Sequence, residues 1–154
     1  MATTFIDTTA ETLFAAPERV YEREPRGPAD LEPVRVYRVE HPVHHIGPYN
    51  APGRYGNSEL ERMYESHNDA AHPSPWRGNE FPREAYYNLT SEYRFAFETV
   101  DALRDWFFGY RAMLRRHGFV LAVYEVPRIA IYFGAHQLAF DERHARRVRE
   151  VRIP

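Results

Sequence analysis

A strand that runs directly into a capped amphipathic helix, between Tyr93 and Gly118, constrains the fold of this chain more than any other segment. Apolar and polar residues alternate from Tyr93 to Phe97, which is the period of a half-buried β-strand. Thr99 then stands at a helix N-cap, and the apolar residues that follow recur at helical spacing. Gly118 is typical of a helix C-terminus. The pattern predicts one well-capped amphipathic helix over residues 99–117, joined to a strand without a linker.

Weaker patterns predict the remaining elements. Ser58 and Glu61 have the spacing of a capping box, which predicts a short helix over residues 59–66. Residues 67–82 form a long irregular stretch, and loops of this length in compact domains are functional or mobile. The predicted strands are 34–40, 93–97, 119–126, 129–133 and 136–140, with 142–152 as a solvated helix or an edge strand. We therefore predict an α+β fold with a small mixed or antiparallel sheet.

The composition fits one globular domain preceded by an arm. The chain has 154 residues, of which 44% are hydrophobic, so it can bury a core of ordinary size. We predict a peripheral N-terminal arm over residues 1–30, with a short helix at 10–21 and a turn at 25–28, and a single globular domain over residues 31–154. The sequence shows neither a secretory apolar run nor a segment of about 18 apolar residues, which predicts a cytoplasmic protein without a membrane partner.

Missing residue types exclude several kinds of chemistry. The chain has no Cys, which excludes disulfides, a thiol nucleophile and cysteine-ligated zinc. All 20 basic side chains are Arg, so this lysine-free chain can form neither a Schiff base nor a Walker-type phosphate site. The net charge of -2 includes no block of like charge, which argues against nucleic acid as a partner. His41, His44 and His45 cluster without an HExxH motif, so no metal site is predicted.

The segment from Val34 to Tyr49 is the best candidate for a ligand site. It reads VRVYRVEHPVHHIGPY, an alternating strand that delivers Arg38 and then breaks into a loop of His, Gly, Pro and Tyr. A strand fixes its side chains within a narrow range of directions, so an arginine and the following aromatics can contact a flat anionic ligand. Tyr49 and Tyr55 are the candidate stacking residues. The alternative is a solvated arginine before an ordinary turn, with aromatics that cover the core.

The order of elements between Val34 and Asp141 resembles the ADP-ribosyltransferase fold. The resemblance rests on the arginine strand, the strand that enters a capped helix, a strand ending in YEVP and a last strand reading HQLAF. In that family the first strand carries an Arg or His for NAD, the second carries small polar residues, and a late strand carries the catalytic Glu. The resemblance matches Arg38 to the first position, puts Thr99 near the second, and puts Gln137 where the Glu is expected. VYRVEHP followed by GPY also resembles small phage proteins from GC-rich hosts.

The glutamine at position 137 decides what such a protein could catalyse. Cleavage of the nicotinamide–ribose bond develops positive charge on the sugar, and a fixed carboxylate stabilises that charge. Gln137 can bind a hydroxyl but carries no charge, and that difference corresponds to roughly one or two tenfold steps in rate. Either another acid acts, or the fold binds a nucleotide without cleaving it. The candidate acids are Glu40, Glu98, Glu125 and Asp141.

Two hypotheses for the function follow. In the first, the protein is an NAD-consuming ADP-ribosyltransferase-like or NAD glycohydrolase-like enzyme, with Arg38 and Gln137 as catalytic residues. In the second, it is a non-catalytic phage-type inhibitor on the same scaffold, which binds an adenine nucleotide signal or a host protein. The predicted ligand-binding residues are Tyr49, Tyr55, Thr99, His41 and His136. The two histidines are included because they flank strands that are expected to line the pocket, where either could also act as an acid or base.

Overall fold

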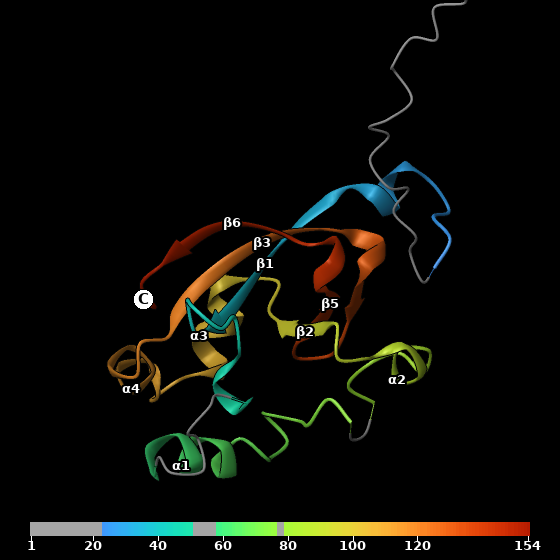
Figure 1. Ribbon diagram of the computed structural model, residues 1–154. Coiled ribbons are helices and arrows are strands. Elements are labelled where there is room, and N and C mark those ends of the chain that lie inside the picture. Colours follow the sequence, from blue (N-terminus) through green and yellow to red (C-terminus); the bar gives the residue numbers. More distant parts are fainter. Residues whose placement is uncertain (1–22, 51–57, 77–78) are drawn as a thin grey trace, which may run out of the picture.

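Two small antiparallel sheets form the centre of the fold, which is α+β as predicted (Figure 1). The structure is a computed structural model that describes residues 23–50, 58–76 and 79–154. The strands are β1 (Pro33–Glu40), β2 (Tyr93–Ala96), β3 (Val120–Pro127), β4 (Ile131–Phe133), β5 (Leu138–Asp141) and β6 (Arg146–Val151). The α-helices of the described residues are α1 (Ser58–Ser66), α2 (Ala85–Asn88), α3 (Val100–Trp106) and α4 (Arg111–Arg116). Short 3-10 turns are η1 (Pro28–Leu31), η2 (Pro48–Asn50), η4 (Arg128–Ala130) and η5 (Glu142–His144).

The two sheets are joined at one point. The first sheet has the order β1-β3-β6 and the second has the order β2-β5-β4. Tyr37 of β1 and Phe97, which follows β2, form an isolated antiparallel bridge. The Tyr37 N–H donates to the Phe97 carbonyl at 2.9 Å, and the Phe97 N–H donates to the Tyr37 carbonyl at 2.8 Å. Phe97 therefore pairs with the first sheet instead of extending β2, and the beginning of α3 is brought against β1.

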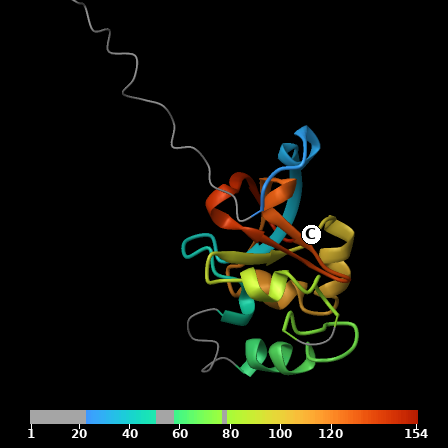
Figure 2. The same ribbon diagram turned by 90° about the vertical axis from the view of Figure 1, so that its right-hand side faces the viewer.

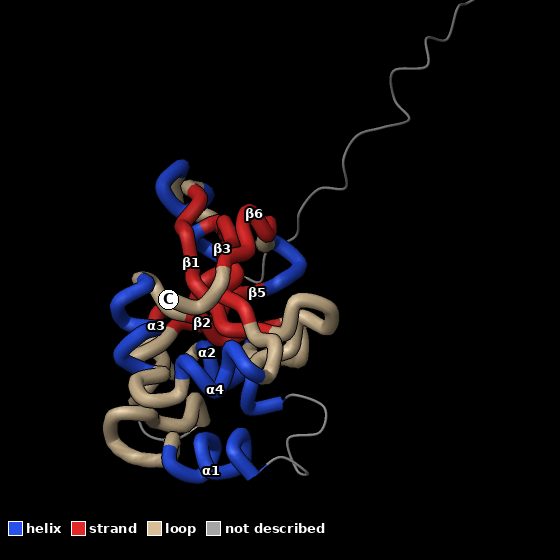
Figure 3. The backbone as a smooth tube through the Cα atoms, turned by 90° about the vertical axis from the view of Figure 1, so that its left-hand side faces the viewer, coloured by secondary structure: helices blue, strands red, loops and turns tan. Residues whose placement is uncertain are grey.

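Side-chain alternation gives the first sheet two buried faces. Val39 packs in a core with α1, α3 and α4, whereas Val36 packs on the opposite face against the second sheet. On the second sheet, Tyr132 and Ala139 pack against α2. Figure 2 shows these layers from the side, and Figure 3 shows β1 beside β3, with α1 at the end of the molecule away from β6. Arg38 lies two residues after Val36, on the same face of β1, so it points between the two sheets.

The predicted helix over residues 99–117 is two helices. Thr99 caps the first as predicted, because its Oγ1 accepts a hydrogen bond from the Ala102 N–H at 3.0 Å. The chain then leaves the helical path after Trp106 and resumes at Arg111. Gly109 adopts φ +84°, a left-handed conformation that glycine reaches without strain. The apolar periodicity continued across this break because both helices bury residues in the same core, so periodicity alone predicted one helix.

Most of the remaining elements lie where the sequence predicted them, but several differ in length. The short helix forms over 58–66, although the side chain of Ser58, which would complete its capping box, lies outside the described part of the chain. The predicted strand 129–133 is shorter, since residues 128–130 form η4, and the tail forms an edge strand, β6. The prediction missed α2. The helix predicted at 10–21 also lies outside the described residues.

Candidate functional site

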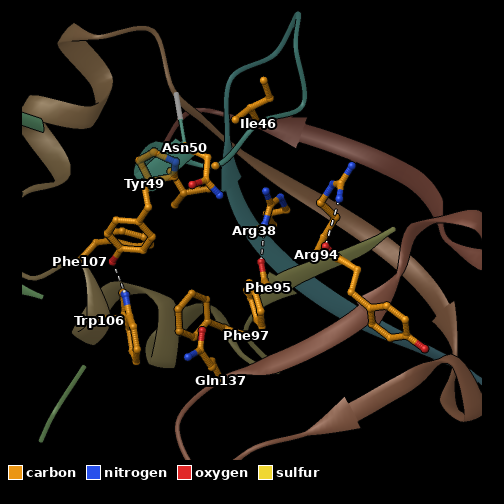
Figure 4. A pocket seen from close by; sticks show the side chains of 14 residues that line it. Arg38, Ile46, Tyr49, Asn50, Arg94, Phe95, Phe97, Trp106, Phe107 and Gln137 are labelled. Carbon is orange, nitrogen blue, oxygen red and sulfur yellow. Dashed lines mark hydrogen bonds between the residues drawn. The ribbon is translucent and has the colours of Figure 1, made fainter. Parts of the chain in front are cut away.

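A cavity of about 350 Å³ lies between β1, β2, the loop after β1 and the end of α3 (Figure 4). Its lining residues are Arg38, Val39, Ile46, Gly47, Pro48, Tyr49, Asn50, Tyr93, Arg94, Phe95, Phe97, Trp106, Phe107 and Gln137. They provide two guanidinium groups and six aromatic rings, with no Asp or Glu among the described residues that line it. Such a lining suits a flat ligand that carries negative charge.

Arg38 is the buried cation of this cavity. Its side chain is held from two sides, because Nε donates to Glu40 Oε2 at 3.2 Å and Nη1 donates to the Phe95 carbonyl at 2.6 Å. The other N–H groups, including both on Nη2, have no partner among the described residues. Gly47 lies so close that a Cβ there would be 3.0 Å from Nη2. Arg38 is only 8% exposed, and this burial lowers the pKa of its guanidinium while the charge of Glu40 opposes the shift.

Glu40 fixes Arg38 from a fully buried position. Besides Arg38, its carboxylate accepts hydrogen bonds from the Arg147 Nε at 3.1 Å and the Tyr124 hydroxyl at 2.9 Å, and it pairs with His45 Nδ1 at 3.1 Å. Burial raises the pKa of Tyr124, and the negative charge of Glu40 adds to the effect, so the phenol stays a donor. One carboxylate thus ties β1, β3, β6 and the loop after β1 together.

Gln137 lies on the same cavity, immediately before β5. The Glu80 carboxylate accepts hydrogen bonds from the backbone N–H groups of His136 and Gln137, each at 3.0 Å, and contacts His136 Nδ1 at 2.9 Å. The Gln137 side chain is 8% exposed and donates from Nε2 to the Pro73 carbonyl at 3.2 Å. Its Oε1 and second Nε2 hydrogen have no partner among the described residues. The irregular stretch 67–82 therefore positions this amide.

Tyr49, Trp106 and Phe107 form an aromatic wall of the cavity. The Tyr49 hydroxyl accepts from Trp106 Nε1 at 2.6 Å and donates to His67 Nδ1 at 2.5 Å. Burial, reinforced by the His72 ring that stacks at 4.0 Å, lowers the pKa of His67 to about 4. His67 is consequently neutral near pH 7, as an acceptor at Nδ1 must be. The tyrosine hydroxyl is fully used within the protein, so its ring is what faces a ligand.

Arg94 also lines the cavity, but no sequence pattern identified it as a site residue. It is the most important of the lining residues that were missed. It lies on β2 and donates from Nη1 to the Tyr93 carbonyl at 3.0 Å and to the Ser91 carbonyl, and from Nη2 to Glu142 at 2.6 Å. The alternating pattern predicted the strand that contains Arg94, but it did not show which strand would lie opposite that one. Phe95 and Phe97 were likewise assigned to a strand without any indication that they face a cavity.

Three of the predicted site residues come together. Arg38, Tyr49 and Gln137 line the same cavity although they lie far apart in the sequence. These three side chains can therefore contact the same ligand. Tyr55 lies outside the described residues.

The other predicted site residues do not line the cavity. Thr99 is occupied as the cap of α3. The His41 ring stacks on His44, with 5.1 Å between centroids, and lies edge-on to Phe119 at 6.1 Å. His136 Nδ1 contacts the Glu80 carboxylate at 2.9 Å. Each of these polar groups has a local structural partner.

None of the four candidate acids is among the described lining residues, although Glu40 contacts Arg38. Glu98 is exposed, whereas Glu125 contacts Arg35 and Arg146. Asp141 accepts hydrogen bonds from Arg143. The Arg143 contacts lower the pKa of the Asp141 carboxyl despite its burial, which acts in the opposite direction. Glu125 and Asp141 thus serve in ion pairs with arginines.

Within residues 23–50, 58–76 and 79–154, no helix has the length and apolar character of a membrane span. Within the same residues, no three His, Asp or Glu side chains are grouped so that they could hold a metal ion.

Comparison with known proteins places the chain among small phage proteins. The model of the family described as Bacteriophage T4 Y00F protein matches residues 34–154. The chain belongs to this family, and the prediction of a phage protein is confirmed. No curated protein and no solved structure matches the chain significantly. The comparisons give no support to the ADP-ribosyltransferase resemblance.

Proposed function

We propose that this phage protein binds a nucleotide in the cavity without cleaving it, and acts in the host cytoplasm as an inhibitor that captures this nucleotide. The observation that carries the proposal is the state of Arg38: this cation is 8% exposed, lies at a cavity walled by aromatic rings, and keeps N–H groups that no described residue accepts. A buried cation with free donors is costly unless a ligand uses them. A phosphate beside Arg38 and a base against the aromatic wall would satisfy both parts.

The lining favours binding over cleavage. Breaking a glycosidic bond to nicotinamide needs a fixed negative charge beside the sugar. The described residues that line the cavity provide none, and Glu40, the nearest acid in sequence to Arg38, is surrounded by its own partners. Gln137 offers hydrogen bonds of a neutral amide only.

One observation favours a second candidate, an NAD-consuming enzyme of ADP-ribosyltransferase or glycohydrolase type. Arg38 and Gln137, the catalytic residues of that hypothesis, line one cavity together with the predicted ligand-binding residue Tyr49. The chemistry would then require a water or an acid that the described lining does not supply. Release of free nicotinamide distinguishes this candidate from a binder.

Calorimetric titration of the full chain with AMP, cyclic AMP, ADP-ribose and NAD tests the proposal. We expect binding without nicotinamide release, and affinity weakened about tenfold or more in Arg38→Gln, because a charge-assisted hydrogen bond is lost. Arg35→Gln is the matched control, since Arg35 lies on the same strand but is an exposed partner of Glu125. Chemical denaturation of each variant shows whether it is folded. The absence of binding by all four ligands would overturn the proposal, and nicotinamide release that Arg38→Gln abolishes would replace it with the second candidate.

A further inference from the structure

We infer that the nucleotide taken by this cavity carries one negative charge, on a phosphodiester, and not the nearly two charges of a terminal phosphate at neutral pH. This inference rests on the proposed function and concerns which class of nucleotide fits the charges around the site. Diesters of this kind include cyclic mononucleotides and linear dinucleoside monophosphates.

The charge around Arg38 is largely compensated by the protein itself. Glu40, which is 0% exposed, contacts both Arg38 and Arg147, so two cations share one buried carboxylate. Glu150 contacts Arg147 at 2.9 Å and offsets part of this excess. The described residues therefore leave at most one net positive charge at this end of the cavity.

The second cation of the cavity is already neutralised. Arg94 pairs with Glu142 at 2.6 Å and spends its Nη1 donors on two backbone carbonyls. Among the described residues, a second negative charge on the ligand would therefore find no matching cation, and burying it in that way is strongly unfavourable. A single charge opposite Arg38 leaves nothing unpaired.

The rest of the cavity is suited to a base. With one Nε2 hydrogen held by Pro73, the Gln137 amide keeps one donor and one acceptor, the pair that a glutamine uses to bind adenine. The volume of about 350 Å³ lies at the lower end of the range for ligand cavities, roughly 300 to 1,000 Å³, which favours one nucleotide unit over two. Adenine derivatives are thus the appropriate probes.

The experiment compares ligands that differ in phosphate charge. Adenosine 3′,5′-cyclic monophosphate and the dinucleoside monophosphate ApA are titrated beside 5′-AMP, near pH 7.5 and near pH 5. The second phosphate pKa of a monoester is about 6, so 5′-AMP becomes a monoanion at the lower pH. We expect the tighter diester to bind about tenfold or more tightly than 5′-AMP near pH 7.5, and this ratio to fall to about threefold near pH 5. The comparison of cyclic AMP with ApA identifies which source of the diester is preferred.

The diesters also serve as the control for titration of the protein, because their charge is the same at both pH values. The groups that face the buried charges are His45, Tyr124 and Arg147 on Glu40, and Glu142 on Arg94, while His67 lies behind Tyr49. Any effect of their titration appears in the affinity of cyclic AMP and ApA and is removed by taking the ratio.

A protein variant tests the same inference from the other side. Glu142→Gln leaves Arg94 without its carboxylate, so we expect the affinity for 5′-AMP relative to cyclic AMP to rise about tenfold near pH 7.5. Glu125→Gln, which removes an acid that pairs with arginines away from the cavity, should leave the ratio unchanged. The inference would be overturned if wild type bound 5′-AMP more tightly than both diesters, or if Glu142→Gln left the ratio of the 5′-AMP and cyclic AMP affinities unchanged. Nucleotide binding itself would remain intact in either case. Absence of binding by every nucleotide would remove both proposals.

Discussion

The two polar ends of the cavity are each held by a buried glutamate, but in different ways. Glu40 holds Arg38 through side chains of the first sheet and forms a network of charges. Glu80 holds Gln137 through the backbone N–H groups of a hairpin turn, across 57 positions of the chain. One end therefore depends on balanced charge within a sheet, and the other depends on a long-range contact that shapes the backbone. Variants at the two glutamates should affect the molecule differently.

The largest loss is expected at the Arg38 end. Glu40→Ala leaves Arg38 and Arg147 without their shared carboxylate in the interior, and breaking a buried ion pair in this way costs about 3–5 kcal/mol. Glu150→Ala is the matched control, because Glu150 also pairs with Arg147 but is 40% exposed, and its removal should cost less than about 1 kcal/mol. Urea denaturation measures both changes. Equal losses in the two variants would show that the network at Glu40 is not held by charge.

The Gln137 end should lose less stability. Glu80→Ala leaves the N–H groups of His136 and Gln137 without an acceptor, which we expect to cost about 2–4 kcal/mol of unfolding free energy. The turn that carries Gln137 would also relax, so nucleotide affinity should fall in protein that is still folded. Glu84→Ala, at an exposed acid of the same segment, should change neither quantity. Stability loss without any effect on affinity would show that Gln137 is not a ligand contact.

The contrast also explains which parts of the site the sequence could predict. Arg38 was accessible to prediction because strand alternation fixes its face, and its burial follows from the packing of the second sheet on that face. The role of Glu80 was not, because nothing local to residues 67–82 indicates that a carboxylate there caps a turn at position 136. Arg94 was missed for the same reason. The helix break at Gly109 was missed for a different reason, because the apolar pattern continues across a glycine that lowers helix propensity.

The aromatic wall of the cavity provides a pH-dependent test. The pKa of His67 is about 4 in the folded protein against about 6.5 in an unfolded chain, so the unfolded state binds more protons between these values. The contribution of His67 is fully present above about pH 6.5 and is lost as the pH falls toward 4. We expect wild type to lose about 2 kcal/mol more than His67→Gln over this window, after allowance for partial exposure. His44→Gln, at an exposed ring, should lose as much as wild type.

The smallest effect is expected at Thr99, which belongs to neither end of the cavity. Thr99→Ala removes the acceptor of the Ala102 N–H and should cost about 1 kcal/mol, whereas Thr99→Ser keeps the cap. Nucleotide affinity should stay within about twofold of wild type in both variants, because Thr99 does not line the cavity. A larger loss of affinity in Thr99→Ala that Thr99→Ser restores would mean that the capped start of α3 sets the position of Trp106 at its other end. The aromatic wall would then be a third support of the cavity, as sensitive as the two glutamates.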